Sequence, residues 1–235
     1  MRVMPINWTW RTTVATVAAL AALMAATGTA TAATDSACAA LGGTVGADQI
    51  CQAHTDNQGY VLDFRFPVDY PDQQALTDVL TQQRDDFTDW IKDMRGAALP
   101  PELDIIGKAY RSGSPAAGTQ SLVLTIGNKA GVHPVTTYKS LNYDLAHHVP
   151  ITFETLFKPG THPRGVLDPI VEREVDKRGG PGPLTLDDLG AEAYQSFAIT
   201  DDAVIFYFNQ DGLLSHVDGP LTVKVPRTEI AALLA

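Results

Sequence analysis

The chain has 235 residues, a formal net charge of −10 at pH 7 and a hydrophobic fraction of 45%. This length suits a single domain with a substantial core. The acidic balance argues against nucleic acid or an anionic membrane surface as a partner, since both repel a negatively charged protein.

The first 32 residues show the pattern of a secretory signal peptide. Arg2 and Arg11 precede the apolar run TTVATVAALAALMAAT, and Ala30-Thr31-Ala32 fits the rule for cleavage sites. The alternative, an uncleaved anchor, is disfavoured because the run has about 16 residues where a span needs roughly 20. We therefore expect one secreted domain over residues 33–235, with no stable membrane span after cleavage, located outside the cell or in its envelope.

The two cysteines of the chain, Cys38 and Cys51, follow directly after the expected cleavage site. In an exported chain such a pair is most simply a disulfide. A metal site is disfavoured because neither cysteine belongs to a CxxC pair and His54 is the nearest histidine. We expect a disulfide-bonded arm over residues 33–58 and no metal or other cofactor.

Hydrophobic periodicity predicts the next elements in chain order. The segment YVLDFRFPV (60–68) alternates like a strand with one buried face, and an apolar stripe then predicts a long amphipathic helix from Pro71 and Asp72 to Gly96. Further strands are expected in DIIGKAYRSGS (104–114), in SLVLTIGN (121–128) and over 135–145, the last two forming a hairpin.

The second half of the chain continues with helices and short strands. We expect a short helix after Thr152, a helix over 163–180, a hairpin over 197–209 that turns at Asp201-Asp202, a strand over 219–226 and a closing helix from Pro226. Adjacent strands with two substantial helices predict an α+β fold, in which a mainly antiparallel mixed sheet packs against these helices.

The strand over 135–145 alternates with period 2, which places Val135, Leu141, Tyr143 and Leu145 on one side. The opposite side carries a polar row that offers hydroxyl, amide and aromatic groups: Thr136, Tyr138, Ser140, Asn142 and Asp144. This row is a candidate recognition surface for a glycan or a protein. The alternative is an ordinary solvated or loop-covered strand face.

Four segments in this order resemble the mycobacterial secreted immunogenic protein family: FPVDYPDQQALTDVLTQQRDDF, GVHPVTTYKSLNYDLAHHVPITFETLF, YQSFAITDDAVIFYFN and GPLTVKVPRTEI. One cell-wall-associated member of this family is described as an esterase. The C-terminal region, about 120–235, resembles the extracellular domain of RsiV-type anti-sigma factors. This resemblance implies an exported α+β protein without a cofactor, and hydrolysis of short acyl esters. RsiV-type domains bind lysozyme, so it also implies the alternative of a noncatalytic binding module for an extracellular protein or glycan.

An esterase needs a nucleophile, a base and donors for the oxyanion. The chain lacks the G-x-S-x-G motif of α/β-hydrolases, so a serine-type carboxylesterase would depend on an unusual triad. Our hypothesis is Ser121 as nucleophile, His133 as base and Asp202 as the carboxylate that orients it. Ordinary structural roles for all three residues are the alternative.

The remaining histidines lack metal-ligand spacing, which leaves a zinc-dependent deacetylase poorly supported. An acidic face of the long helix (Asp78, Asp85, Asp86, Asp89 and Asp93) is explained by solvation or by attraction of a basic protein such as lysozyme. We expect a monomer.

Overall fold

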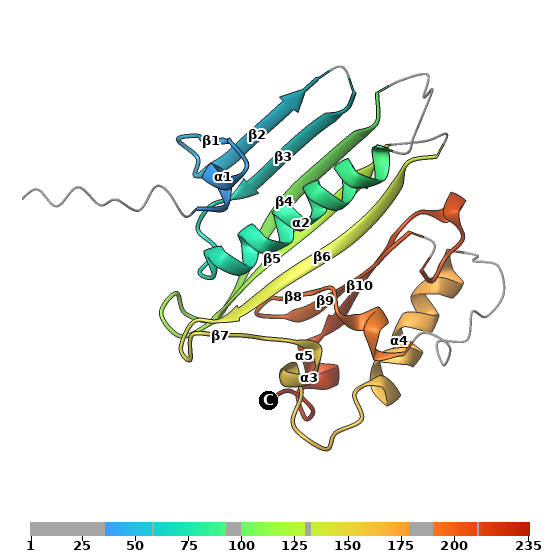
Figure 1. Cartoon of the computed structure of the whole chain (residues 1–235). Coiled ribbons are helices and arrows are strands. Elements are labelled where there is room, and N and C mark those ends of the chain that lie inside the picture. Colours follow the sequence, from blue (N-terminus) through green and yellow to red (C-terminus); the bar gives the residue numbers. More distant parts are fainter. Residues whose placement is uncertain (1–35, 58, 93–99, 130–132, 179–189, 211) are drawn as a thin grey trace, which may run out of the picture. The chain divides into compact units, whose positions relative to one another are not determined.

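A seven-stranded sheet forms the centre of the structure (Figure 1). The computed structural model describes residues 36–57, 59–92, 100–129, 133–178, 190–210 and 212–235, which lie in one compact unit, Ala32–Ala235. The strands lie side by side in chain order: β1 (Thr44–Val45), β2 (Ile50–Asp56), β3 (Val61–Pro67), β4 (Glu102–Ser112), β5 (Thr119–Asn128), β6 (Val135–Asp144) and β7 (Val149–Pro150). Among these described strands the neighbours pair antiparallel except β3 and β4, which pair in parallel.

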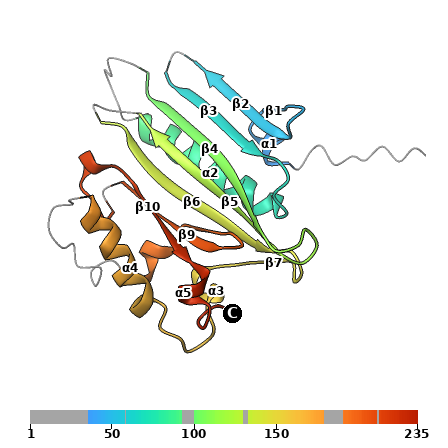
Figure 2. The same ribbon diagram turned by 180° about the vertical axis from the view of Figure 1, so that it is seen from behind.

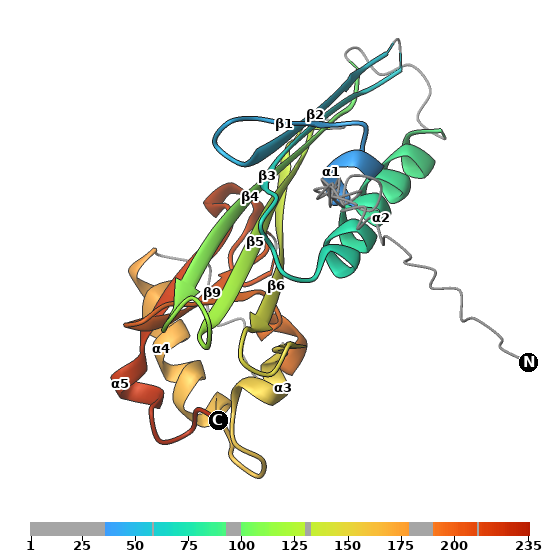
Figure 3. The ribbon, with the colours of Figure 1, turned by 90° about the vertical axis from the view of Figure 1, so that its left-hand side faces the viewer.

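The long helix α2 (Gln73–Ile91) covers one face of this sheet (Figure 3). Asp72 caps its first turn by accepting a hydrogen bond of 3.0 Å from the amide of Ala75. Leu76, Leu80 and Phe87 are buried on its inner side against alternating apolar residues of the strands. The parallel β3–β4 pair requires a crossover connection, and α2 is the helix of that connection.

A second, three-stranded sheet has the order β10-β9-β8 and is antiparallel throughout its described strands: β8 (Phe197–Ile199), β9 (Ala203–Phe208) and β10 (Leu221–Pro226). It shares a core with the helices seen from behind in Figure 2: α3 (Phe153–Leu156), α4 (Arg164–Lys177) and α5 (Arg227–Ile230). Tyr194, fully buried in this core on the 3₁₀ helix η2 (Ala191–Tyr194), donates a hydrogen bond of 2.5 Å to Asp168.

The two sheets meet where β8 and β9 pack on the face of β5 and β6 opposite to α2 (Figure 3). Val123, Ala198 and Tyr207 are buried in this contact. The hydroxyl of Tyr207 donates a hydrogen bond of 2.6 Å to that of Tyr110, and its ring packs against the ring of Tyr138. The face of the large sheet that carries the polar row is therefore largely an internal contact.

The predicted α+β fold and its mainly antiparallel mixed sheet are confirmed. The disulfide is also confirmed: Cys38 on the short helix α1 (Ala37–Ala40) is bonded to Cys51 on β2, and both residues are buried. The segment expected to form an arm supplies β1 and β2 to the sheet. The small buried residues of β2, such as Ala53, give too weak an apolar alternation to predict a strand from the sequence.

The later elements occur where periodicity predicted them, with shifted ends. Thr152 and Thr155 form a reciprocal capping box at α3, and α5 ends at Ile230, before the expected end of the closing helix. No helix among the described residues is long and apolar enough to cross a membrane. The predicted signal peptide, together with Asp93 and Gly96, lies outside the described residues.

Candidate functional site

A cavity of about 500 Å³ lies between the C-terminal half of α2 and the neighbouring ends of β4, β5 and β6. This volume is within the range of about 300–1,000 Å³ that is usual for small-molecule sites. Ten residues line it: Gln83, Asp86, Phe87, Trp90, Leu103, Ile126, Asn128, His133, Val135 and Thr137. One wall is helical and the other is formed by the sheet.

The floor of this cavity is apolar. Phe87, Leu103 and Ile126 are almost fully buried and belong to the core under α2. Trp90 follows Phe87 on the helix, with 6.3 Å between their ring centroids, and remains 47% exposed. A buried floor with an exposed indole at its edge is suited to an apolar ligand group that keeps a polar end near solvent.

The carboxylates on this part of α2 differ in their partners. Asp85 pairs with Arg84 at 2.8 Å, and Asp89 pairs with Lys92 at 2.5 Å. The Arg84 guanidinium lowers the pKa of Asp85 through their hydrogen bond. Asp86, which lines the cavity, has no ion-pair partner among the residues that the structure describes.

His133 stands at the entrance of β6, as predicted, and its imidazole lines the cavity. The imidazole of His216 packs against it edge-on, with 5.5 Å between the ring centroids. His133 is the only histidine among the described lining residues, and it is exposed to solvent.

Ser121 lies far from this site. It pairs with Asn142 near the open end of the β5–β6 hairpin, whereas His133 precedes the pair Asn128–Val135 at the loop end. Asn128 follows Ser121 by seven positions along β5, which is about 23 Å at roughly 3.3 Å per residue. The structure does not bring the hydroxyl of Ser121 to the imidazole of His133.

Asp202 lies at the β8–β9 turn, as expected, but is occupied by other partners. Its carboxylate accepts hydrogen bonds of 2.7 Å each from Lys224 and Thr200, which lower its pKa, Lys224 contributing most. The three residues of the hypothetical triad are thus distributed over separate parts of the structure and do not form a triad.

Most side chains of the polar row on β6 pack against, or form hydrogen bonds with, the second sheet and the residues next to η2. Ser140 accepts a hydrogen bond of 2.9 Å from the amide of Phe197, and Asn142 is only 4% exposed. The backbone amides of Thr136 and Tyr138 donate to the side chains of Gln210 and Asn209.

Asp144, the last member of the row, organises the turn after β6. It accepts hydrogen bonds from the amides of Ala146 and His147 and from the His147 ring, which together lower its pKa, the ring contributing most. The structure gives the row packing roles in place of a free recognition surface.

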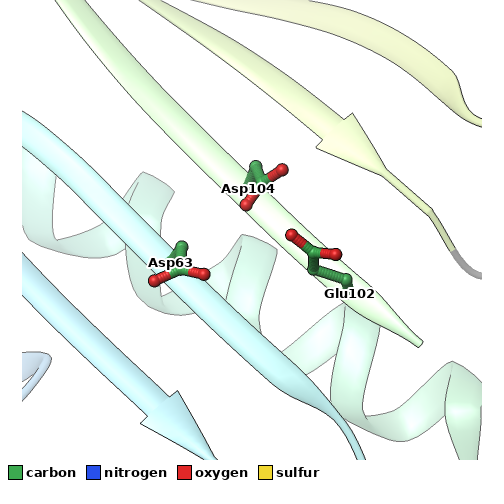
Figure 4. A group of neighbouring side chains, drawn as sticks. All are labelled: Asp63, Glu102 and Asp104. Atoms are coloured by element: carbon green, nitrogen blue, oxygen red, sulfur yellow. The ribbon is translucent and has the colours of Figure 1, made fainter. Parts of the chain in front are cut away.

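One carboxylate cluster has the spacing of a possible metal site (Figure 4). Oxygen atoms of Asp63, Glu102 and Asp104 lie within 4.8 Å of one another on β3 and β4. Lys129 forms ion pairs with both Glu102 and Asp104, and His54 pairs with Asp63 at 2.6 Å. Protein cations already compensate this cluster, so it does not resemble a vacant cation site.

The sequence did not single out Gln83, and it named Asp86 only as part of the acidic face of the long helix. Trp90 belongs to the apolar stripe that predicted this helix, and such a stripe indicates core residues. Trp90 does follow the helical spacing of core residues, but it lies in the last turn of α2, beside a cavity at the ends of β4, β5 and β6, and remains half-exposed. Local periodicity contains no signal that separates these two situations.

Comparison with known proteins identifies relatives over most of the chain. The family described as "Protein of unknown function (DUF3298)" matches residues 154–228. The esterase Rv3036c of Mycobacterium tuberculosis is 47% identical over 199 residues, which cover 83% of this chain and 88% of that protein. The immunogenic protein MPB64 of Mycobacterium bovis is 38% identical over 216 residues, covering 91% and 94%, and MPT64 of M. tuberculosis gives the same values.

Solved structures support the fold. A DUF3298 family protein from Pseudomonas aeruginosa superposes with a TM-score of 0.56 at 10% identity, covering 79% of this chain and 92% of that one. A DUF3298 member from Bacteroides fragilis gives a TM-score of 0.51 at 13% identity, with coverages of 79% and 93%.

Proposed function

The chain belongs to the family of the esterase Rv3036c and the immunogenic proteins MPB64 and MPT64, and on this premise we propose that it is an exported hydrolase of short acyl esters. The disulfide Cys38–Cys51 supports export, because such bonds persist in oxidising compartments. The relative named as an esterase supports the reaction class.

The observation that carries this proposal is the cavity between α2 and the sheet, which combines an apolar floor with a histidine. An acyl chain can lie on Phe87, Leu103 and Ile126, which places its carbonyl group toward the polar lining. Gln83, half-buried on the helical wall, offers a side-chain amide for hydrogen bonding to that oxygen.

The chemistry that fits this lining is attack by water with His133 as general base. The imidazole takes a proton from water while the water oxygen bonds to the acyl carbon. The bond between this carbon and the alcohol oxygen then breaks, and the imidazolium returns the proton to the departing alkoxide. The products are a carboxylic acid and an alcohol, and no further reactant is required.

A serine-type reaction at Ser121 has less support. The Ser121 side chain is fully buried, and its hydroxyl accepts a hydrogen bond from the backbone of β8. No serine lines the cavity among the residues that the structure describes.

The second candidate function is a noncatalytic extracellular binding module for a protein such as lysozyme or for a glycan. One observation favours it: no serine is among the described residues that line the cavity with His133, so that part of the chain offers no serine nucleophile there. In that case the same cavity would hold a ligand without turning it over.

The decisive experiment compares hydrolysis of p-nitrophenyl acetate and butyrate by highly purified wild-type protein with hydrolysis by His133→Gln. We expect kcat/KM to fall by about 100-fold or more, the usual contribution of a general base. His147→Gln is the matched control, since His147 is an exposed histidine in the turn after β6. Equal trace activity in all three proteins would indicate contamination and favour the binding module.

A further inference from the structure

The mouth of the cavity carries two groups that the proposed hydrolysis does not use. Trp90 presents an indole that is 47% exposed, and Asp86 presents a carboxylate one turn earlier on α2. Residues spaced by four on a helix lie on the same side, so both groups face the same mouth. Both residues line the same cavity as the apolar floor.

The described lining of the cavity carries an acidic side chain and no lysine or arginine. Asp86 is the only Asp, Glu, Lys or Arg among the described lining residues, and His133 is the only histidine among them. The neighbouring carboxylates, Asp85 and Asp89, form ion pairs with Arg84 and Lys92, whereas Asp86 has no ion-pair partner among the described residues. The nearby cation Lys129 is bound to Glu102 and Asp104, and strand alternation places these on the sheet face opposite to α2.

An indole next to an unpaired carboxylate has a defined ligand preference. The face of an indole attracts cations, most strongly when part of their hydration is removed, and tryptophan is the best side chain for this interaction. A carboxylate adds Coulomb attraction, and a quaternary ammonium group brings methyl groups that suit an apolar surface. A neutral ligand of the same shape obtains only the apolar part.

We propose that this cavity selects esters that carry a quaternary or protonated ammonium group, with the acyl chain on the apolar floor and the cation between Asp86 and Trp90. This substrate class rests on the esterase function proposed above. It names a specificity that general acyl ester hydrolysis does not require.

The kinetic test compares butyrylcholine with 3,3-dimethylbutyl butyrate, its neutral isostere. The measured quantity is the ratio of kcat/KM for the cationic ester to kcat/KM for the neutral ester. We expect the wild-type ratio to exceed about 5 at low salt and to fall as salt screens the carboxylate. A ratio near 1 would overturn the proposal.

Two variants test whether Asp86 and Trp90 cause the preference for the cationic ester. Asp86→Asn removes the charge and keeps the shape, and Trp90→Leu keeps an apolar side chain of high helix propensity without an aromatic face. Each is expected to lower the ratio by at least about threefold. Asp85→Asn is the matched control, because Asp85 is one residue away and pairs with Arg84. An equal loss of preference in Asp85→Asn would mean that the general acidity of α2, and not this site, is responsible.

A binding test decides the proposal even if no ester is hydrolysed. The chain has three tryptophans, Trp8, Trp10 and Trp90, so Trp8→Phe with Trp10→Phe in the full chain leaves Trp90 as the only indole fluorophore. Choline should then change the fluorescence of Trp90 saturably, 3,3-dimethylbutanol should require a much higher concentration, and Asp86→Asn should remove the difference. An equal response to both compounds, or no response, refutes the cation site. Absence of turnover together with selective choline binding refutes only the esterase.

Discussion

The amide of Ile199 donates a hydrogen bond of 3.0 Å to the hydroxyl of Ser121, and this contact links the second sheet to the first. β8 is an edge strand, so the amides on its outer side have no ladder partner. Ser121 satisfies the amide of Ile199 and Ser140 satisfies that of Phe197 at 2.9 Å. Polar side chains on the large sheet thus complete the hydrogen bonding of an edge strand that packs on them.

Ser121→Ala is therefore expected to affect stability and not the proposed chemistry. The variant leaves the buried amide of Ile199 without an acceptor, which costs about 1–3 kcal/mol. Urea unfolding measures this change, and ester hydrolysis by the folded variant should equal that of wild type. Ser114→Ala also removes an acceptor, that of the Ala117 amide at 3.2 Å, but in an exposed turn where water can replace it, so it should cost less than Ser121→Ala. A folded Ser121→Ala protein without turnover would restore Ser121 as a nucleophile.

Removing the disulfide should destabilise the N-terminal part of the large sheet. Cys38 and Cys51 are 13 residues apart, and closing a loop of this length stabilises the folded state by about 3 kcal/mol in the chain-entropy model. The double variant Cys38→Ala, Cys51→Ala should unfold at lower urea concentration than the oxidised wild type. Reduced wild type should shift in the same direction, and an unchanged midpoint in both would contradict a stabilising role.

Asp144 is expected to control the titration of His147. The hydrogen bond of 2.8 Å between them raises the pKa of His147 above 6.5 and lowers the pKa of Asp144 below 3.8. A raised histidine pKa stabilises the folded protein fully below 6.5 and loses this effect as the pH rises through the raised value. A lowered carboxyl pKa stabilises above 3.8 and loses this effect as the pH falls through the lowered value. The pair therefore acts most strongly between these limits.

NMR titration of the imidazole tests this relationship. Asp144→Asn should return the pKa of His147 toward 6.5. Asp63→Asn is a parallel control, since Asp63 raises the pKa of His54 in the same manner and should leave His147 unaffected. A His147 pKa that does not respond to Asp144→Asn would show that the contact is not maintained in solution.

Blocking the cavity should remove acyl binding without unfolding the protein. Thr137 is half-buried on β6 and lines the cavity, so Thr137→Phe fills it with a residue that strands accept well. We expect hydrolysis of p-nitrophenyl butyrate to fall at least about tenfold, in line with loss of a well-fitted acyl contact. Lys139→Phe adds the same ring two residues further on the same side of β6, where the side chain is exposed, and should retain activity. Equal activity in both variants would place the acyl site elsewhere.

The sequence by itself determined the elements that depend on local periodicity. Each of these features depends on a short stretch of chain. They are the apolar stripe of α2, the alternation in β3, β5 and β6, the Thr152 cap and the disulfide of Cys38. They were predicted because helices and strands repeat at fixed intervals and because two cysteines that follow a predicted signal peptide most simply form a disulfide.

Only the tertiary structure decided what each face contacts. Alternation placed Ser121 and Ser140 on definite sides of their strands but did not show that a second sheet covers those sides. The hairpin register then separated Ser121 from His133 and brought His133 to Asp86 and Trp90, which are more than 40 residues earlier in the chain. Contacts between distant segments depend on the packing of whole elements, and a period of two or 3.6 residues carries no information about them.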